Sequence, residues 1–359
     1  MKSRVSLPLA ALTLALSPLA MAQNNASVTV YGIVDANVQV LNAASTLTRV
    51  QSGGLNGSRL GFKGTEDLGG GLRALFTLES GLNIDDGSTG QGTFWGRQAY
   101  VGLGTPYGTV TLGRQYGSLY ALSADFSEFS NNNIGASTAV IGGFGGYEPV
   151  RGANASASGN GGPARVNNSV KFESVRFGGF SAGALVGLGE VAGNTSGNRV
   201  GDVYARYTDA GFDAMLSYVD DKAEVTGANV RTTSAAAAYS FGPARVTGGV
   251  ISVDDRSVAN ADGEGYWVGG SYRVGSNLFK AQYVQSKLKH AVVDGKTKAF
   301  GVGYQYDLSK RTSLYSSLTQ FKNEGVGYTA RAAGRFSSGV TSATDADITE
   351  FAAGIRHSF

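Results

Sequence analysis

The side chains of this chain that could do chemistry are mainly its arginines, because the usual catalytic residues are scarce. The sequence has no cysteine and only two histidines, His290 and His357. With so few histidines, neither a metal-binding cluster nor a set of nucleophile, histidine and acid can be assembled. The 54 glycines form no G-x-S-x-G or phosphate-binding motif. We therefore expect no enzymatic activity, no metal and no cofactor.

Three arginines fall on the polar side of segments in which polar and apolar residues alternate. Arg59 and Arg165 each lie opposite their apolar neighbours, and Arg97 lies opposite Phe94 and Tyr100. Guanidinium groups around a narrow, water-filled passage would create a fixed positive field that attracts anions. Taken one at a time, each arginine is better explained as an ordinary water-facing residue.

Arg114 does not follow this alternation. It has the same parity as the apolar Val110 and Leu112, so a regular strand would point it towards lipid. A charged side chain in that place would cost about 2 to 4 kcal/mol at the middle of a bilayer. We therefore expect Arg114 to lie just past the last regular strand pair.

The composition indicates that the structure holding these side chains consists of β-strands joined by many turns. The chain has 359 residues, of which 54 are glycine, 6 are proline and only 16% are charged. Glycine is therefore roughly twice as common as in an average protein, which does not fit an ordinary helix-rich enzyme. Hydrophobic residues make up 42% of the chain, which is too apolar for a disordered protein.

The dominant periodicity is an alternation of apolar and polar residues, which predicts strands with one apolar face. It recurs at 28–40, 72–79, 180–188, 300–308 and 351–359. After the N-terminal segment, no apolar run reaches the roughly eighteen residues that a membrane-spanning helix needs. Any passage through a membrane would therefore be made by strands.

The connections between these strands alternate between short and long. Seven short turns fall at 67–71, 105–108, 178–179, 209–211, 242–243, 275–277 and 307–310. Eight longer polar connections fall at 42–56, 83–92, 115–164, 190–198, 220–229, 254–263, 288–296 and 322–343. This rhythm joins about sixteen strands with both chain ends on the short-turn side, as in outer-membrane barrels. We predict an all-β, 16-stranded antiparallel transmembrane barrel, since a soluble two-sheet sandwich would not require the alternation of connection lengths.

Both ends of the chain agree with this prediction. Residues 1–22 combine a basic start, an apolar stretch and an Ala-Met-Ala cleavage site, which indicates a secretory signal peptide rather than a retained anchor. The mature domain, 23–359, has nearly balanced charges and no nucleic-acid signature. The last alternating segment ends on Phe359, and pairing it with the first strand would close the barrel.

Five segments carry a resemblance to a known family. They are 28–32 (VTVYG), 58–69 (SRLGFKGTEDLG), 97–103 (RQAYVGL), 113–117 (GRQYG) and 357–359 (HSF). In this order they resemble the trimeric general porins of Gram-negative bacteria, in particular the β-proteobacterial branch. The resemblance implies a homotrimer in the outer membrane, in contact with lipid and lipopolysaccharide, whose third long loop, 115–164, folds inward and narrows the pore. It also implies that Phe359 is read by the barrel-assembly machinery.

The resemblance further implies which residues line the constriction of the pore. The matching positions are the basic Arg59, Arg97, Arg114 and Arg165 on the wall and the acidic Asp125 and Glu128 on the loop. Serines and asparagines surround Glu128, where the family motif has a proline and glycines. Because the basic positions outnumber the acidic ones, we predict a moderate preference for anions, strongest at low salt.

Two kinds of function fit these features. The first is passive diffusion of small hydrophilic solutes and ions, in which nothing binds tightly because tight binding would stop conduction. The second is binding or adhesion by the long polar loops, or a channel for one specific solute. A solute-specific channel would carry a ladder of aromatic residues or clustered lysines in its lumen, and the sequence shows neither. Diffusion is therefore our prediction, and adhesion alongside it stays open.

Overall fold

The computed structural model describes residues 26–129, 164–222, 229–256, 261–290, 295–325 and 347–359. The predicted signal peptide, 1–22, lies outside these ranges. The described elements, in chain order, are β1 (Ser27–Asn42), β2 (Thr46–Ser52), β3 (Arg59–Gly69), β4 (Leu72–Gly81), β5 (Gln98–Thr105), β6 (Gly108–Tyr116), α1 (Ser118–Phe126), β7 (Arg165–Ser174), β8 (Phe180–Gly187), β9 (Val200–Asp209), β10 (Phe212–Lys222), β11 (Asn229–Phe241), β12 (Ala244–Asp255), β13 (Ala261–Val274), β14 (Asn277–His290), β15 (Gly295–Asp307), β16 (Thr312–Gly325) and β17 (Ile348–Ser358). Among the residues described, no helix is long and apolar enough to cross a membrane.

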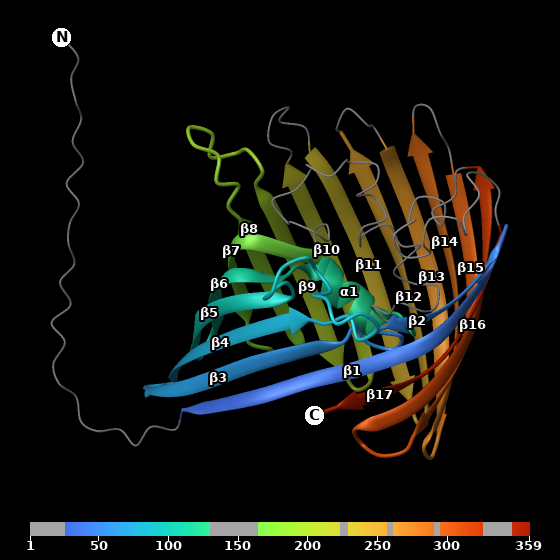
Figure 1. Cartoon of the computed structure of the whole chain (residues 1–359). Helices are drawn as coiled ribbons and strands as arrows, with labels where there is room; N and C mark the ends of the chain where they lie inside the picture. Colours follow the sequence, from blue (N-terminus) through green and yellow to red (C-terminus); the bar gives the residue numbers. More distant parts are fainter. Residues whose placement is uncertain (1–25, 130–163, 223–228, 257–260, 291–294, 326–346) are drawn as a thin grey trace, which may run out of the picture.

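The strands form a single antiparallel sheet that closes on itself (Figure 1). From β3 to β17 each strand pairs with the next, and β17 pairs with β1. Both β2 and β3 pair with the same edge of β1, β2 with residues 36–42 and β3 with residues 27–33. They therefore share one place in the wall, and the barrel has 16 strand positions, which confirms the predicted fold class.

The connections have the predicted rhythm except at 42–56, which was predicted to be one long connection but contains β2, paired with β1. Short turns join β3 to β4, β5 to β6, β9 to β10, β11 to β12 and β13 to β14, and the long connections fall between these hairpins. Gly242 and Gly275 adopt a positive φ of 56° in two of the short turns, a conformation that favours glycine. The short turns therefore lie at one end of the barrel and the longer connections at the other.

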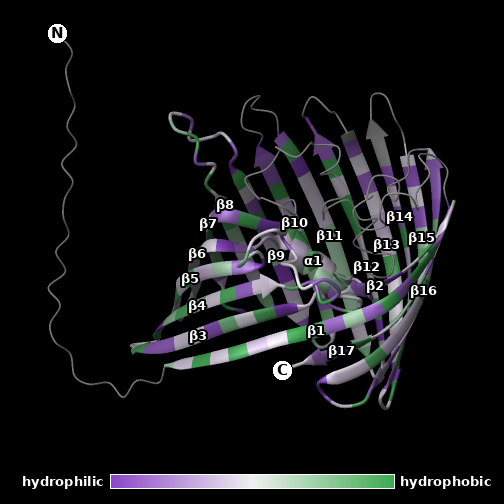
Figure 2. Ribbon diagram, in the orientation of Figure 1, coloured by the Kyte–Doolittle hydropathy of each residue, from purple (hydrophilic) through white to green (hydrophobic). Residues whose placement is uncertain are grey.

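The outer face of the barrel is apolar and the inner face is largely polar, as the alternating colours along each strand show (Figure 2). On β1, the outward Val28 and Val30 are 65% and 54% exposed, while the inward Asp35 and Gln39 are fully buried. Apolar side chains on the outside of a transmembrane barrel contact lipid rather than water. Each strand therefore presents one face to lipid and the other to the lumen.

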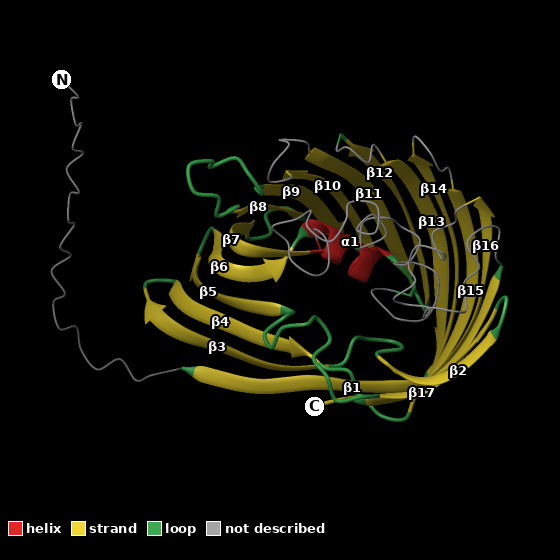
Figure 3. Cartoon of the chain, turned by 45° about the horizontal axis from the view of Figure 1, so that its top comes forward, coloured by secondary structure: helices red, strands yellow, loops and turns green. Residues whose placement is uncertain are grey.

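The apolar core of the molecule lies inside the barrel, around α1 (Figure 3). Leu119, Leu122 and Phe126 of α1 are completely buried and belong to one cluster with inward residues such as Met215 and Trp267. The helix contacts β9, β10, β11 and β12. Because β6 continues to Tyr116 and β7 begins at Arg165, the third long connection spans 117–164, slightly shorter than the predicted 115–164. Its part from 130 to 163 lies outside the described residues.

The C-terminal residue completes the closure of the barrel. The backbone N–H of Gly32 donates to the carbonyl oxygen of Phe359 (3.2 Å), and the N–H of Phe359 donates to the carbonyl oxygen of Gly32 (3.1 Å). The Phe359 ring covers Gly32 so closely that a Cβ there would lie 2.3 Å from the ring and 2.7 Å from the carbonyl oxygen of Arg59. Only glycine fits at this position. The role of Phe359 as an assembly signal stays a prediction.

This packing predicts that Gly32→Val destabilises the closed barrel, because the new side chain would overlap both Phe359 and the backbone of β3. Overpacking of this kind costs about 1 to 3 kcal/mol of unfolding free energy. Urea unfolding of refolded protein in detergent, followed by intrinsic fluorescence, measures the loss. Val38→Leu is the matched control, since Val38 is 49% exposed on the same face of β1. Equal stability of the two variants would contradict the prediction.

Candidate functional site

Four arginines lie together on one part of the inner wall, around Tyr116 and Tyr120. We call Arg59, Arg97, Arg114 and Arg165 the arginine cluster. Arg59 is the first residue of β3, Arg97 directly precedes β5, Arg114 lies near the end of β6 and Arg165 is the first residue of β7. The guanidinium of Arg165 lies 5.3 Å from the centre of the Tyr116 ring and 5.7 Å from that of Tyr120. Strands that are neighbours in the barrel thus bring together residues far apart in sequence.

Arg97 is the most buried member of the cluster and forms an ion pair. Its Nε donates to Oε1 of Glu79 at 2.7 Å, and the two residues are only 4% and 3% exposed. Glu79 also accepts hydrogen bonds from the hydroxyls of Tyr31 (2.9 Å) and Tyr116 (2.8 Å). A second guanidinium nitrogen of Arg97 donates to the Tyr120 hydroxyl at 3.2 Å. Arg97 therefore links the wall to α1, and Glu79 balances its charge.

The alternation argument for Arg97 was wrong in one respect. Tyr100 does not face lipid, because its hydroxyl accepts a hydrogen bond from the buried, inward Thr77 at 3.1 Å. Arg97 precedes the first residue of β5, so the parity of that strand does not determine its direction. The ion pair with Glu79 is what holds Arg97 on the inner side.

Arg114 lies where the pairing of β6 with β7 is irregular. The register shifts between Gly113 and Gln115, and Gly113 has a φ of 137°. Nε of Arg114 donates to the carbonyl oxygen of Gly96 at 2.8 Å, and the same guanidinium donates to the Asn167 side chain. The expectation that Arg114 lies past the last regular strand pair was wrong, because Arg114 pairs with Ala99 of β5 and pairing with β7 resumes at Gln115. A β-bulge re-aims a side chain that strict alternation would turn towards lipid.

Arg59 and Arg165 form no ion pair with a carboxylate within the part of the chain that the structure describes. Nε of Arg59 donates to the carbonyl oxygen of Gly57 at 2.9 Å, and Arg165 contacts the two tyrosine rings. Burial alone would raise the pKa of the Tyr120 hydroxyl, but Arg97 and Arg59 outweigh burial and lower this pKa below its usual value. The cluster therefore creates a positive potential at α1.

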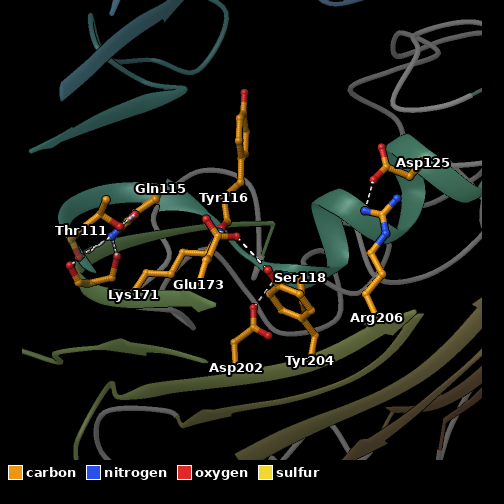
Figure 4. A network of polar contacts seen from close by, with 11 residues as sticks. Thr111, Gln115, Tyr116, Ser118, Asp125, Lys171, Glu173, Asp202, Tyr204 and Arg206 are labelled. Atoms are coloured by element: carbon orange, nitrogen blue, oxygen red, sulfur yellow. Dashed lines mark hydrogen bonds and ion pairs between the residues drawn. The ribbon is translucent and has the colours of Figure 1, made fainter. Parts of the chain in front are cut away.

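The two predicted acidic residues, Asp125 and Glu128, contact other arginines than those of the cluster. Asp125, in the last turn of α1, pairs with Arg206 of β9 at 2.6 Å (Figure 4). Glu128 pairs with Arg245 of β12 at 3.1 Å. Arg206 also pairs with Asp213 of β10, so Asp125 shares its arginine with a second carboxylate, whereas the Glu128 carboxylate pairs with Arg245.

Further hydrogen bonds fasten α1 to this part of the wall. At its start, the N–H of Ser118 donates to the carboxylate of Asp202 on β9 at 2.6 Å (Figure 4). At its end, Nε1 of Trp267 donates to the carbonyl oxygen of Phe126 at 2.6 Å. Asp202 satisfies one of the N–H groups that a helix start leaves unpaired. The helix is therefore held at both ends.

Sequence reasoning missed Glu79, Arg206 and Arg245 as members of the site. Strand alternation does place each of them on the polar face, so their inward direction could have been found. Their partners could not, because Arg206 and Asp125 are 81 residues apart and meet only where α1 packs against β9. The arrangement combines a cluster of four arginines and one carboxylate with a tethered helix whose acidic groups are paired.

Comparisons with known proteins agree with this geometry. The Gram-negative porin family matches residues 9–326. Outer membrane porin protein 32 of Delftia acidovorans is 32% identical over 358 residues, covering 96% of this chain and 97% of that protein. The solved anion-selective porin from Comamonas acidovorans is 29% identical, with a TM-score of 0.76 over 93% of this chain and all of that one. OmpT of Vibrio cholerae, solved in a trimer form, is 16% identical with a TM-score of 0.66, over 93% of this chain and 99% of that one, and shares the fold. The chain belongs to the family of Gram-negative porins, which form channels in the outer membrane.

Proposed function

We propose that this outer-membrane porin passes small hydrophilic solutes and ions by diffusion and prefers anions, with the arginine cluster as the basis of the preference. The observation that carries the proposal is the imbalance of charge at the arginine cluster. The cluster holds four arginines and one carboxylate, Glu79, whereas Asp125 and Glu128 are paired with Arg206 and Arg245. A low-dielectric wall focuses the field of such unbalanced charges into the lumen.

The strength of the attraction between the arginines and a passing anion suits a diffusion channel. In water, two unit charges about 4 Å apart interact with about 1 kcal/mol, which changes a local ion concentration roughly fivefold. An anion passing somewhat farther from an arginine gains less, so the preference should be moderate. The anion selectivity of the Comamonas acidovorans porin, with which this chain shares its fold and 29% identity, supports the proposal.

Replacing Arg59 and Arg165 together by glutamine should lower the chloride-to-potassium permeability ratio at least twofold. These two arginines are the best choice because they lack a carboxylate partner among the residues described, whereas a change at Arg97 would leave Glu79 buried without its cation. The reversal potential of refolded protein in a planar bilayer under a potassium chloride gradient measures the ratio.

The matched control for this experiment is Lys298→Gln. Lys298 has the parity of Phe300, which is 53% exposed on the outer face of β15, so its charge does not face the lumen. We expect this control to keep the wild-type ratio. A double variant with an unchanged ratio would show that the cluster does not set the preference.

The preference should also weaken as salt rises. The Debye length shrinks from about 10 Å at 0.1 M to about 3 Å at 1 M ionic strength, so the field of the cluster reaches less of the lumen. Permeability ratios measured at constant gradient but increasing mean concentration should fall towards the ratio of free mobilities. A ratio that does not depend on salt would point to selection by shape rather than by charge.

The quaternary structure belongs to the same proposal. We propose a homotrimer, supported by the family and by the trimer form of the OmpT fold relative. An aromatic group on the outer face is available for such contact: Phe94, which is 61% exposed, packs edge-on against Trp95, and Trp95 against Phe62 of β3. Contacts with lipopolysaccharide and with the barrel-assembly machinery remain predictions.

The trimer predicts that native mass spectrometry of detergent-released protein gives three times the mass of the mature chain. The same sample should migrate as a large species on a gel without heating and as a monomer after boiling. Phe94→Asp should weaken the assembly, because it places a charge in an apolar contact. A protein that is folded but monomeric at all concentrations would contradict the trimer.

A further inference from the structure

A buried carboxylate, that of Asp35, lies at the point where one strand of the wall is interrupted. Between β2 and β3 the chain leaves the sheet for residues 53–58, which we call the 53–58 insert. On the other side of this gap is β1, and Asp35 is its residue opposite the insert. Asp35 is completely buried.

The insert lies on the inner side of the wall. Leu55 is 5% exposed and clusters with Tyr315 and Ala352, which are inward residues of β16 and β17. The Asn56 side chain accepts a hydrogen bond from Arg356 at 2.8 Å. The chain therefore folds into the lumen here rather than outward.

Asp35 holds the insert with its backbone and its side chain. Its carbonyl oxygen accepts a hydrogen bond from the N–H of Gly53 (2.8 Å), and its N–H donates to the Ser58 hydroxyl (3.0 Å). Its carboxylate accepts from the N–H groups of Gly54 (3.0 Å) and Asn56 (2.8 Å). The hydroxyl of Tyr315 donates to the same carboxylate at 2.6 Å. All of these donors to the carboxylate are neutral, so its bonds serve to fix the backbone of the insert.

The insert in turn contacts the arginine cluster. Its Gly57 accepts the hydrogen bond from Nε of Arg59 at 2.9 Å. A Cβ at Gly57 would lie 3.2 Å from a guanidinium nitrogen of Arg97, so the two groups are in close contact. Arg97 thus lies between the insert on one side and Tyr120 of α1 on the other. The insert therefore helps to determine where the Arg59 side chain is held.

We propose that Asp35 is a positioning residue for ion selectivity: through the 53–58 insert it fixes Arg59 and narrows the lumen at the arginine cluster. This inference rests on the proposed function, because a variant can lose an anion preference only if the wild-type channel has that preference. It adds a second inward element to the pore, independent of the third loop. A negatively charged residue thereby supports a preference for negative ions.

The direction in which one substitution changes the chloride-to-potassium permeability ratio tests this proposal. Asp35→Asn keeps the size of the side chain but replaces one of the two accepting carboxylate oxygens by an NH2 group, which cannot accept a hydrogen bond from an N–H. A looser insert should raise the single-channel conductance and lower the chloride-to-potassium permeability ratio at least twofold. If Asp35 acted only through its charge, removing a negative charge from the wall would raise the ratio instead.

Glu350→Gln is the matched control. Glu350 is also a fully buried, inward carboxylate, on β17, and it accepts a hydrogen bond from Gln39 at 2.8 Å. This variant removes the same charge without touching the bonds of the insert described above, so its ratio should stay the same or rise. A fall in Asp35→Asn with no fall in Glu350→Gln supports the proposal.

Tyr315→Phe keeps the inference testable if Asp35→Asn does not fold. It removes only the hydroxyl that donates to Asp35, and it should shift conductance and ratio in the same directions by a smaller amount. A lowered unfolding temperature with an unchanged ratio, in either variant, would show a purely structural role and overturn the proposal. A wild-type channel that prefers cations would instead refute the proposed function itself, so the two failures are distinguishable.

Discussion

The structure depends on one constraint, which is that every backbone N–H and C=O group in contact with lipid needs a partner in the protein. A strand cannot satisfy its own backbone, so the sheet has to close, and β17 does this by pairing with β1. Closure also explains the packing of Phe359 on Gly32, because these two residues extend the pairing of β17 with β1 by one further hydrogen-bonded pair. The apolar outer face and the polar lumen are consequences of the same closure, since successive side chains of each strand point to opposite sides.

Irregular backbone is then possible only where the protein itself supplies the partners, and both irregular inner segments use a buried carboxylate for this. Asp202 accepts the N–H of Ser118 at the start of α1, and Asp35 accepts those of Gly54 and Asn56 in the 53–58 insert. Leaving such groups unpaired in a buried place would cost about 1 to 3 kcal/mol each. An inward carboxylate on a neighbouring strand solves this problem without interrupting the lipid-facing surface.

Most of the fold could be predicted from sequence because its two signals are local. Alternation in segments such as 300–308 marks a strand, and turn residues such as Gly242 mark its end, so the order of short and long connections follows. The break between β2 and β3 was not predicted, because residues 42–56 look like one polar connection and their pairing with β1 depends on contacts within the barrel. The direction of the Arg97 side chain could not be derived from the alternation for a similar reason. An ion pair, and not the alternation of a strand, determines this direction.

The inner charges differ in what they can do according to whether they are paired. Arg206 pairs with Asp125 and Asp213, and Arg245 pairs with Glu128, so these contacts fasten the third loop to the wall and add no net positive charge to the lumen. Glu79 holds Arg97 in the same way. Arg59, by contrast, is held by a neutral carbonyl oxygen, which fixes its position and leaves its charge uncompensated by that bond. Counting charged residues from sequence cannot separate these roles, because the count of arginines and acids is the same whichever of them are paired. We therefore expect the selectivity of this pore to depend less on the number of its arginines than on which of them have neutral partners.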